Sequence, residues 1–176
     1  MRIVGGRWAG RDLASPRDFR VRPTAELVRA ELMDTLAPEL KGARVADLFA
    51  GTGALGLEAL SRGAWRADFV ETRPESLHAL KRNIARLGAR DRTRVFPHDA
   101  LPWAARCAFD QYDVAFVDPP YESRMLDRVL DTWRATGFAR VLAAEHAPGH
   151  PLPPGERRLE WEHGAVTLYR RAAADR

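Results

Sequence analysis

The chain has 176 residues, of which 45% are hydrophobic and 30% charged, with a formal net charge of +4. This length suits one well-buried domain and is too short for two comfortable ones. The single cysteine, Cys107, excludes a disulfide framework, and the five histidines lack metal-ligand spacing, so no metal is expected. No stretch approaches the roughly 20 apolar residues of a membrane span, and the start of the chain has no apolar leader. We therefore expect a cytoplasmic protein.

The basic residues are unusual in kind and in place. Of the 28 bases only two are lysines, Lys41 and Lys81, so 26 are arginines. Residues 1–22 hold six arginines and two acids, and their net charge of +4 equals that of the whole chain. Because the guanidinium group matches phosphate geometry, this segment is a candidate RNA-binding arm, carried by Arg7, Arg11 and Arg17. A solvated terminus and a compositional preference for arginine are the alternatives.

The first two elements lie before the main domain. The Gly- and Arg-rich stretch MRIVGGRWAGRDL predicts a short hairpin. A helix follows, with Thr24 as its N-cap and with Val28, Leu32 and Leu36 at fourfold spacing, and it should end before Pro38.

From Lys41 onward, apolar strands alternate with helices. Strands are expected at 45–49, 67–71, 93–96, 112–117 and 140–146, helices at 54–63, 74–88, 101–109 and after Ser123, and a closing hairpin at 157–171. This alternation predicts an α/β fold, a largely parallel sheet with helices on both faces. Such sheets bind ligands at the carboxyl ends of their strands.

A glycine motif, Gly51-Thr52-Gly53-Ala54-Leu55-Gly56, lies between the first strand of this domain and its helix. Glu71 follows Gly51 by 20 residues, at the end of the next strand, where an acid can accept both hydroxyls of a ribose. The pair predicts an adenosine-containing cofactor, either a dinucleotide or S-adenosylmethionine. Glycines that merely allow close helix–strand packing are the alternative.

Two further acids belong to the same strand ends. Asp47 lies inside the first strand, where a carboxylate needs a hydrogen bond, and it is expected to hold the glycine loop from below. Asp99, at the end of the third strand, either meets the adenine or caps the following short helix.

The fourth strand ends in Asp118-Pro119-Pro120-Tyr121. A cap for the next helix is not the expected role of Asp118, because the helical pattern begins only near Met125 and Ser123 is the better cap. The prolines fix two φ angles, so these residues should form a rigid lip with an acceptor carboxylate and an aromatic ring. Such a lip can stack a planar base and accept hydrogen bonds from its exocyclic amine, which directs the nitrogen lone pair at a methyl sulfonium.

Several of these stretches together resemble a known family. VADLFAGTGALGLEALSRGA, FVE and YDVAFVDPPY resemble the class I S-adenosylmethionine-dependent methyltransferases, in particular those that methylate amines. MRIVGGRWAGRDL, RPTAELVRAEL and GAVTLY resemble more narrowly the bacterial RsmD-like family, which methylates the N2 amine of one guanine in small-subunit (16S) ribosomal RNA. The chain departs from that pattern at Leu27, where an arginine is usual, and at Ala30-Glu31, where the order is reversed.

The resemblance implies a Rossmann-like fold with a seven-stranded, mostly parallel sheet and an antiparallel last strand. A small basic N-terminal extension, 1–40, would precede the methyltransferase domain, 41–176. By matching position, the residues implied to bind the cofactor are Asp47, Phe49, Gly51, Thr52, Gly53, Glu71, Asp99 and Ala100. Those implied to hold the target base are Asp118, Pro119, Pro120 and Tyr121, and Arg22 and Thr24 would lie over the cofactor or guide RNA.

The implied cofactor is S-adenosylmethionine, and the implied substrate is ribosomal RNA within the small subunit or an assembly intermediate. No metal and no membrane are implied, and we expect a monomer. A DNA adenine-N6 methyltransferase, which uses a similar tetrapeptide, is the nearest alternative, but this chain has little room for a domain that reads duplex DNA. A nucleotide-binding oxidoreductase would leave Asp118–Tyr121 without a role, and a non-catalytic binding module would not need them.

Overall fold

The computed structural model describes residues 1–15, 23–120 and 124–171, with the side chains of 23–25 excepted. Its strands are β1 (Arg44–Leu48), β2 (Arg66–Val70), β3 (Thr93–Phe96), β4 (Tyr112–Val117), β5 (Ala139–His146), β6 (Arg157–Trp161) and β7 (Gly164–Arg170). Its α-helices are α1 (Pro23–Thr35), α2 (Ala37–Leu40), α3 (Ala54–Ser61), α4 (Pro74–Arg86), α5 (Ala100–Ala104) and α6 (Met125–Thr136). Two short 3-10 helices are η1 (Gly6–Trp8) and η2 (Arg90–Arg92).

One seven-stranded sheet organises these elements, in the order β3-β2-β1-β4-β5-β7-β6. β1 to β5 pair in parallel, and β7 runs antiparallel to both of its neighbours, β5 and β6. The fold expected from the sequence is therefore confirmed. The strand order reverses between β1 and β4, which is where sheets of this kind open a ligand cleft at their carboxyl ends.

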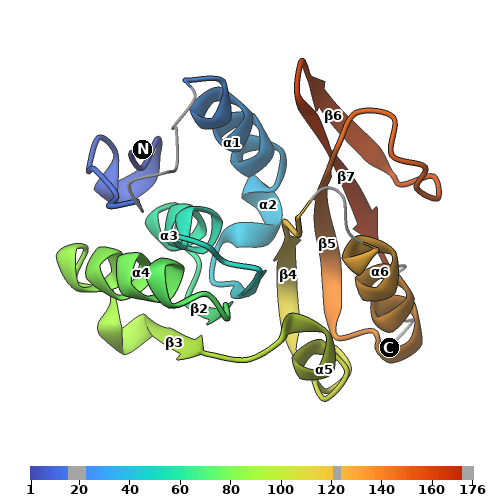
Figure 1. The fold of residues 1–176 in the computed structure, drawn as a ribbon. Helices are drawn as coiled ribbons and strands as arrows, with labels where there is room; N and C mark the ends of the chain where they lie inside the picture. Colours follow the sequence, from blue (N-terminus) through green and yellow to red (C-terminus); the bar gives the residue numbers. More distant parts are fainter. Residues whose placement is uncertain (16–22, 121–123, 172–176) are drawn as a thin grey trace.

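Alternate residues of the strands face two separate hydrophobic layers. Val45 and Phe116 pack with α1 to α4 on one face, whereas Leu48 and Val117 pack with α5 and α6 on the other. Figure 1 shows the same division, with α1, α3 and α4 on one side of β4 and β5, and α5 and α6 on the opposite side. Successive residues of a strand point to opposite faces of the sheet, and here both faces are buried. The strands are therefore nearly continuous apolar runs in the sequence.

Two of the predicted helices differ in detail. α1 begins at Pro23, so Thr24 lies within the helix and not at its N-cap, and Pro38 sits in the first turn of α2. α5 ends at Ala104 instead of continuing to Phe109. Turns replace the rest of this predicted helix: the N–H of Ala108 donates to the Gln111 side chain at 2.9 Å, and Asp110 adopts a φ of 52°.

The predicted N-terminal hairpin is confirmed in a minimal form. Arg2 and Asp12 form an antiparallel bridge, and the Ile3 N–H donates to the Arg11 carbonyl at 2.9 Å. Ile3, Trp8 and Leu13 are buried in the same layer as α1 to α4. The boundary between an extension at 1–40 and a domain at 41–176 stays a prediction, because the hairpin shares this core.

Glu58, in the middle of α3, joins the hairpin to the domain. Its carboxylate is fully buried and accepts the N–H groups of Val4 at 2.8 Å and Gly5 at 2.7 Å. It also pairs with Arg29 of α1 at 3.4 Å and with Arg62 at 3.0 Å. A buried carboxylate is tolerated only when its lone pairs are filled in this way, so Glu58 fixes the position of three segments at once.

We expect Glu58→Ala to lower the free energy of unfolding by about 3–5 kcal/mol, because it leaves the buried Arg29 guanidinium and two N–H groups without their acceptor. Urea unfolding followed by circular dichroism measures this loss. Glu160→Ala is the matched control, since it removes a largely exposed ion pair with Arg158 and should change stability by less than about 1 kcal/mol. Equal effects of the two substitutions would show that the Glu58 cluster does not anchor the hairpin.

Candidate active site

A cavity of about 550 Å³ opens at the carboxyl ends of the central strands. The volume is that of a site for a drug-sized or cofactor-sized molecule. Its walls come from the ends of β2 and β5, from the segments after β1, β2, β3 and β4, and from the start of α6. They comprise Phe49, Val70, Glu71, Thr72, Arg73, His98, Asp99, Ala100, Asp118, Pro119, Pro120, Met125 and Glu145. The cavity thus brings together predicted site residues from four separate stretches of the chain: Phe49, Glu71, the pair Asp99 and Ala100, and the Asp118–Pro120 lip.

The glycine loop divides into a ligand side and a packing side. Gly51 has a φ of 55°, and a Cβ added to it would meet no atom closer than 3.9 Å. A Cβ on Gly56, by contrast, would lie 2.4 Å from a ring carbon of Phe69, and one on Gly53 would lie 2.4 Å from Leu80. Close packing therefore accounts for Gly53 and Gly56, whereas Gly51 leaves open space beside the backbone.

Asp47 supports this loop from below, as predicted. Its Oδ2 accepts the N–H of Gly56 at 2.9 Å, in the first turn of α3. Burial raises the pKa of this carboxyl from 3.8 to about 8, against the lowering effect of the Gly56 hydrogen bond, and the nearby Glu71 raises it further. Asp47 does not line the cavity, so it acts on the site through the loop that it holds and through its electrostatic effect on Asp118.

Two neighbouring residues have different surroundings. Phe49 lines the cavity with a φ of 62°, a conformation that bulky residues rarely adopt and that marks local strain of the kind found at binding sites. Thr52 is buried, and its carbonyl accepts from the Asn83 side chain at 3.0 Å while its hydroxyl lies 3.8 Å from the Met1 sulfur. Thr52 thus holds the loop against α4, outside the cavity wall.

Glu71 is fixed at the end of β2 by three backbone donors. The N–H groups of Gly51 and Thr72 donate at 2.8 Å and that of Arg73 at 2.9 Å, and the Arg73 guanidinium lies at 3.4 Å. Burial raises the pKa of this carboxyl, but the hydrogen bonds from Arg73 and Gly51 outweigh burial, so the pKa lies below its usual value. Glu71 is therefore an oriented anion in the cavity wall, as a ribose-binding acid must be.

Asp99 caps α5, since its Oδ1 accepts the N–H of Leu101 at 3.2 Å. The capping alternative is confirmed, and a contact with adenine stays a prediction for a residue that also lines the cavity together with Ala100. His98, next to it in the same wall, was not predicted.

Asp118 meets a second carboxyl group that the sequence analysis did not identify. Val117 of β4 pairs with Ala144 of β5, so Asp118 and Glu145 follow at the same level of two adjacent strands, and both line the cavity. Burial, then Glu145 and then Asp47, raise the pKa of Asp118 well above its usual value. An acid directly after the apolar run Val141–Ala144 was the available signal, but only the strand register places Glu145 beside Asp118.

The lip around Asp118 agrees with the prediction as far as it is described. Pro119 and Pro120 line the cavity, and Asp118 does not cap α6, which begins at Met125 with Arg124 as its N-cap. Tyr121 and the predicted cap Ser123 lie outside the described residues.

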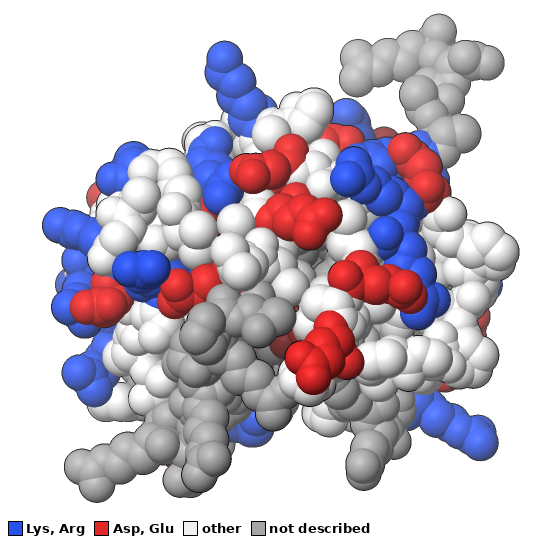
Figure 2. Space-filling model, turned by 90° about the horizontal axis from the view of Figure 1, so that it is seen from above, with Lys and Arg blue, Asp and Glu red and all other residues white. Residues whose placement is uncertain are grey.

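Two of the candidate RNA-binding arginines, Arg7 and Arg11, lie on the hairpin, apart from the cavity wall. Arg7 stacks on the Trp8 ring at 4.3 Å, and Arg92 approaches the same ring at 5.3 Å. Arg11 donates to the carbonyl of Arg86 in α4 at 3.4 Å. Figure 2 shows the molecule of Figure 1 from above. On the face seen there, basic side chains lie mainly along the rim, and several acidic ones lie nearer the middle. Arg17, Arg22 and the side chain of Thr24 lie outside the described residues.

Among the described residues, no three histidines, cysteines or acids are grouped as metal ligands would be. Their helices also include none with the length and apolar composition needed to cross a bilayer. The donor set instead fits an adenosine-containing cofactor, because the cavity combines an oriented carboxylate, Glu71, with apolar walls. Gly51 is not itself in the cavity wall, but its N–H donates to Glu71 and its backbone borders open space.

Comparisons with known proteins agree with this geometry. The family model described as conserved hypothetical protein 95 matches residues 1–142. The ribosomal RNA small subunit methyltransferase D of Escherichia coli K12 is 35% identical, over 98% of this chain and 91% of that protein. A solved Escherichia coli structure with a provisional assignment as a methyltransferase superposes with a TM-score of 0.86, at 33% identity over 99% of both chains. The structure of a hypothetical protein from Thermus thermophilus gives a TM-score of 0.81, at 33% identity over 97% of this chain and 99% of that one.

The raised pKa of Asp47 predicts how stability depends on pH. Between the unfolded value of 3.8 and the folded value of about 8, the folded protein holds a proton that the unfolded chain releases, so stability falls as the pH rises. Asp118 acts in the same direction, and Glu71, with its lowered pKa, loses stability only in more acidic solution. We expect Asp47→Asn to remove a loss on the order of 4 kcal/mol between about pH 5 and pH 8.

Urea unfolding across this pH range measures the slope for each protein. Asp131→Asn, on the exposed side of α6, is the control and should keep the slope of the unsubstituted chain. Parallel profiles for Asp47→Asn and the unsubstituted protein would mean that Asp47 is ionised in the fold near neutral pH.

Proposed function

This chain belongs to the family described as conserved hypothetical protein 95, and we propose that it methylates the exocyclic N2 amine of one guanine in small-subunit (16S) ribosomal RNA. Its cofactor is S-adenosylmethionine, and the protein is a methyltransferase with a Rossmann-like fold. The relatives named as ribosomal RNA methyltransferases support the substrate class. The choice of amine rests on the two carboxyl groups, Asp118 and Glu145, that line one cavity.

S-adenosylmethionine supplies an electrophilic methyl group on a positively charged sulfur. Glu71 would accept its ribose hydroxyls, Gly51 would let the backbone approach it, and Asp99 and Ala100 would border its adenine. Asp47 acts indirectly, since its bond to the Gly56 N–H holds the loop in place. Thr52 and Gly53 serve the same loop by packing.

Guanine and adenine present different edges to a pair of carboxyl groups. On guanine, the N2 amine lies beside the N1–H group, so two adjacent donors face the protein. On adenine, the N6 amine lies beside an unprotonated N1, which is an acceptor. Two neighbouring acceptors, Asp118 for the amine and Glu145 for N1–H, therefore match guanine and repel the N1 lone pair of adenine.

The transfer itself requires orientation and a place for one proton. The Asp118 carboxylate and the Pro119 carbonyl accept the two N–H groups of the amine, which directs the nitrogen lone pair at the methyl carbon. As the N–C bond forms and the C–S bond breaks, the nitrogen becomes positively charged and releases one proton. Asp118 accepts this proton in its ionised form, and its raised pKa makes that form a stronger base than an ordinary carboxylate. Tyr121 is expected to stack on the base.

The remaining expectations concern the substrate as a whole. We infer that the hairpin and α1, within residues 1–40, contact the RNA backbone through Arg7, Arg11, Arg17, Arg22 and Thr24, while 41–176 carries out the transfer. We propose that the protein acts as a monomer on the small subunit or an assembly intermediate. An arm this compact makes few contacts, so the shape of the assembled substrate would supply most of the recognition. The pair Asp118 and Glu145 argues against the DNA adenine-N6 alternative, because the unprotonated N1 of adenine would face a second acceptor.

Labelled S-adenosylmethionine supplied with unmethylated small subunits, and separately with deproteinised RNA, tests the proposal. We expect label on the N2 amine of one guanine, identified by mass spectrometry of the digested RNA. In Asp118→Ala the rate should fall by at least about a hundredfold, because the amine loses its acceptor, while cofactor affinity by calorimetry stays unchanged.

Asp131→Ala, on the exposed side of α6, is the control and should transfer normally. Label on another atom would refute the guanine-N2 assignment, and transfer to neither RNA would refute the substrate class. Normal turnover by Asp118→Ala would remove the role given to that carboxylate.

The role of Glu145 is tested by two exchanges: in the RNA base an acceptor replaces the N1–H donor, and in the protein a donor replaces the Glu145 acceptor. RNA with 2-aminopurine at the target position keeps the N2 amine but has an unprotonated N1. The unsubstituted enzyme should prefer guanine, whereas Glu145→Gln, whose amide can donate to N1, should shift the ratio of kcat/KM toward 2-aminopurine by roughly tenfold or more. An unchanged ratio, with both rates lowered alike, would show that Glu145 does not contact N1.

A further inference from the structure

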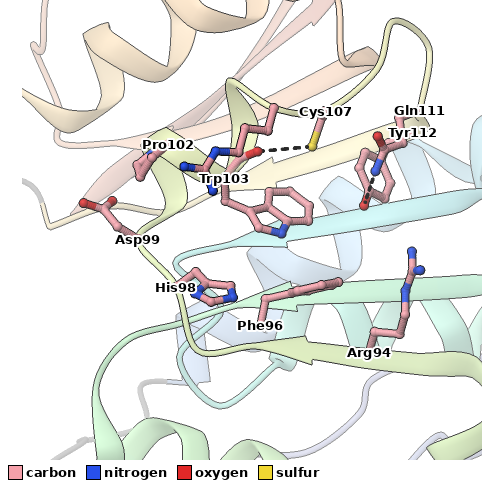
Figure 3. A pocket seen from close by; sticks show the side chains of 10 residues that line it. Arg94, Phe96, His98, Asp99, Pro102, Trp103, Cys107, Gln111 and Tyr112 are labelled. Carbon is pink, nitrogen blue, oxygen red and sulfur yellow. Dashed lines mark hydrogen bonds between the residues drawn. The ribbon is translucent and has the colours of Figure 1, made fainter.

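A second cavity, of about 460 Å³, lies on the α5 side of the sheet, between the edge strand β3, α5 and the start of β4. Figure 3 shows Phe96, from β3, and Trp103, from α5, as neighbouring walls of this groove. The transfer reaction described above uses none of its aromatic residues.

The groove presents aromatic rings that are only partly covered. Phe96 and Trp103 have ring centroids 5.3 Å apart at an interplanar angle of 53°, and Trp103 and Tyr112 are 5.8 Å apart at 32°. Tyr112 is buried at the inner end, whereas Phe96 and Trp103 stay half-buried. Within the described residues, the Trp103 indole N–H has no hydrogen-bond acceptor. A flat, partly polar molecule would find both a stacking surface and a donor here.

Two arginines, Arg94 and Arg106, border the rings, and they differ in their partners. Arg94 stacks on Phe96 at 5.6 Å and is held by the buried Asp68 carboxylate, to which it donates at 2.5 and 2.9 Å. The Tyr112 hydroxyl donates to the same carboxylate at 2.7 Å. Arg106 is exposed and forms no ion pair among the described residues. One guanidinium is thus fixed at the groove, and a second is available to an anion.

The groove and the active-site cavity share two wall residues, His98 and Asp99. A chain that places one unit in the active site can therefore continue into the groove. Proteins bind single-stranded nucleic acid with features of this kind: stacking rings, a hydrogen-bond donor such as an indole N–H, and an exposed guanidinium.

We propose that this groove binds an unpaired nucleotide that flanks the methylated one, with its base stacked on Trp103 and Phe96 and its phosphate beside Arg106. This inference rests on the proposed function, since it requires RNA in the adjacent cavity. It adds a contact on the side of the sheet opposite to the N-terminal hairpin.

The test measures the affinity of each variant for a fluorescently labelled RNA fragment that contains the target guanine, still unmethylated. Trp103→Leu should weaken binding roughly 5- to 100-fold, because a leucine keeps apolar volume but removes the stacking surface, and Trp103→Phe should weaken it less. The control is Trp65→Leu, since Trp65 is a surface tryptophan beside an arginine, Arg66, but lies outside the groove. Thermal unfolding checks that each variant is folded.

A second variant keeps the test decisive if Trp103→Leu is unstable. Arg106→Gln should lower RNA affinity and reduce the salt dependence by about one charge, while Arg66→Gln leaves both unchanged. Unchanged RNA affinity in the groove variants, or equal losses in the control variants, would overturn the inference. A parallel fall in S-adenosylmethionine affinity would overturn it too, by assigning the groove to the cofactor.

The two proposals fail in different ways. If the unsubstituted protein methylates its RNA and the groove variants bind as it does, only this inference is wrong. If the unsubstituted protein neither binds nor methylates ribosomal RNA, the proposed function is wrong as well.

Discussion

Four carboxyl groups, Asp47, Glu71, Asp118 and Glu145, lie in or directly beneath one cavity, and the rest of the site depends on how the fold tolerates them. Backbone N–H groups and Arg73 stabilise Glu71 as an anion, whereas burial and mutual repulsion raise the pKa values of Asp47 and Asp118. The ionised Glu71 favours a positively charged sulfonium in this cavity. A carboxylate there also repels phosphates, and the basic side chains along the rim in Figure 2 offset that repulsion.

Glu58 shows by contrast why a buried acid placed against another acid indicates function. Glu58 is a fully buried carboxyl group in the middle of α3, and two backbone N–H groups and two guanidinium groups saturate it. Its role is to hold the hairpin and α1 on α3. Asp118 instead lies beside a second carboxyl group, Glu145, in the wall of the cavity, and Glu145 helps to raise its pKa. Ionisable groups with pKa values shifted in this way are concentrated at functional sites.

Local patterns in the sequence predicted most of the fold and the parts of the site that are contiguous in the chain. The glycine loop, Glu71 and the Asp118–Pro120 lip could be found because each is a short motif directly after an apolar strand. Glu145 could not be found in this way, since its position beside Asp118 follows from the register of β4 with β5. Arg29 is a similar case: its burial against Glu58 joins residues far apart in sequence, and its helix reads as an ordinary amphipathic one.

The wrong prediction for α5 has a structural consequence. The pattern LPWAARCAF predicted a helix over 101–109, but the helix ends at Ala104, and the Gln111 side chain accepts the Ala108 N–H in the turns that follow. A helix continued to Phe109 would extend over the face of the sheet that Phe96 and Tyr112 line. Because α5 stops early, those rings border an open groove beside an edge strand, instead of a closed core layer. Trp103, which belongs to the expected helix, therefore lines this groove together with Phe96 and Tyr112, and the edge of the sheet next to the active-site cavity stays open.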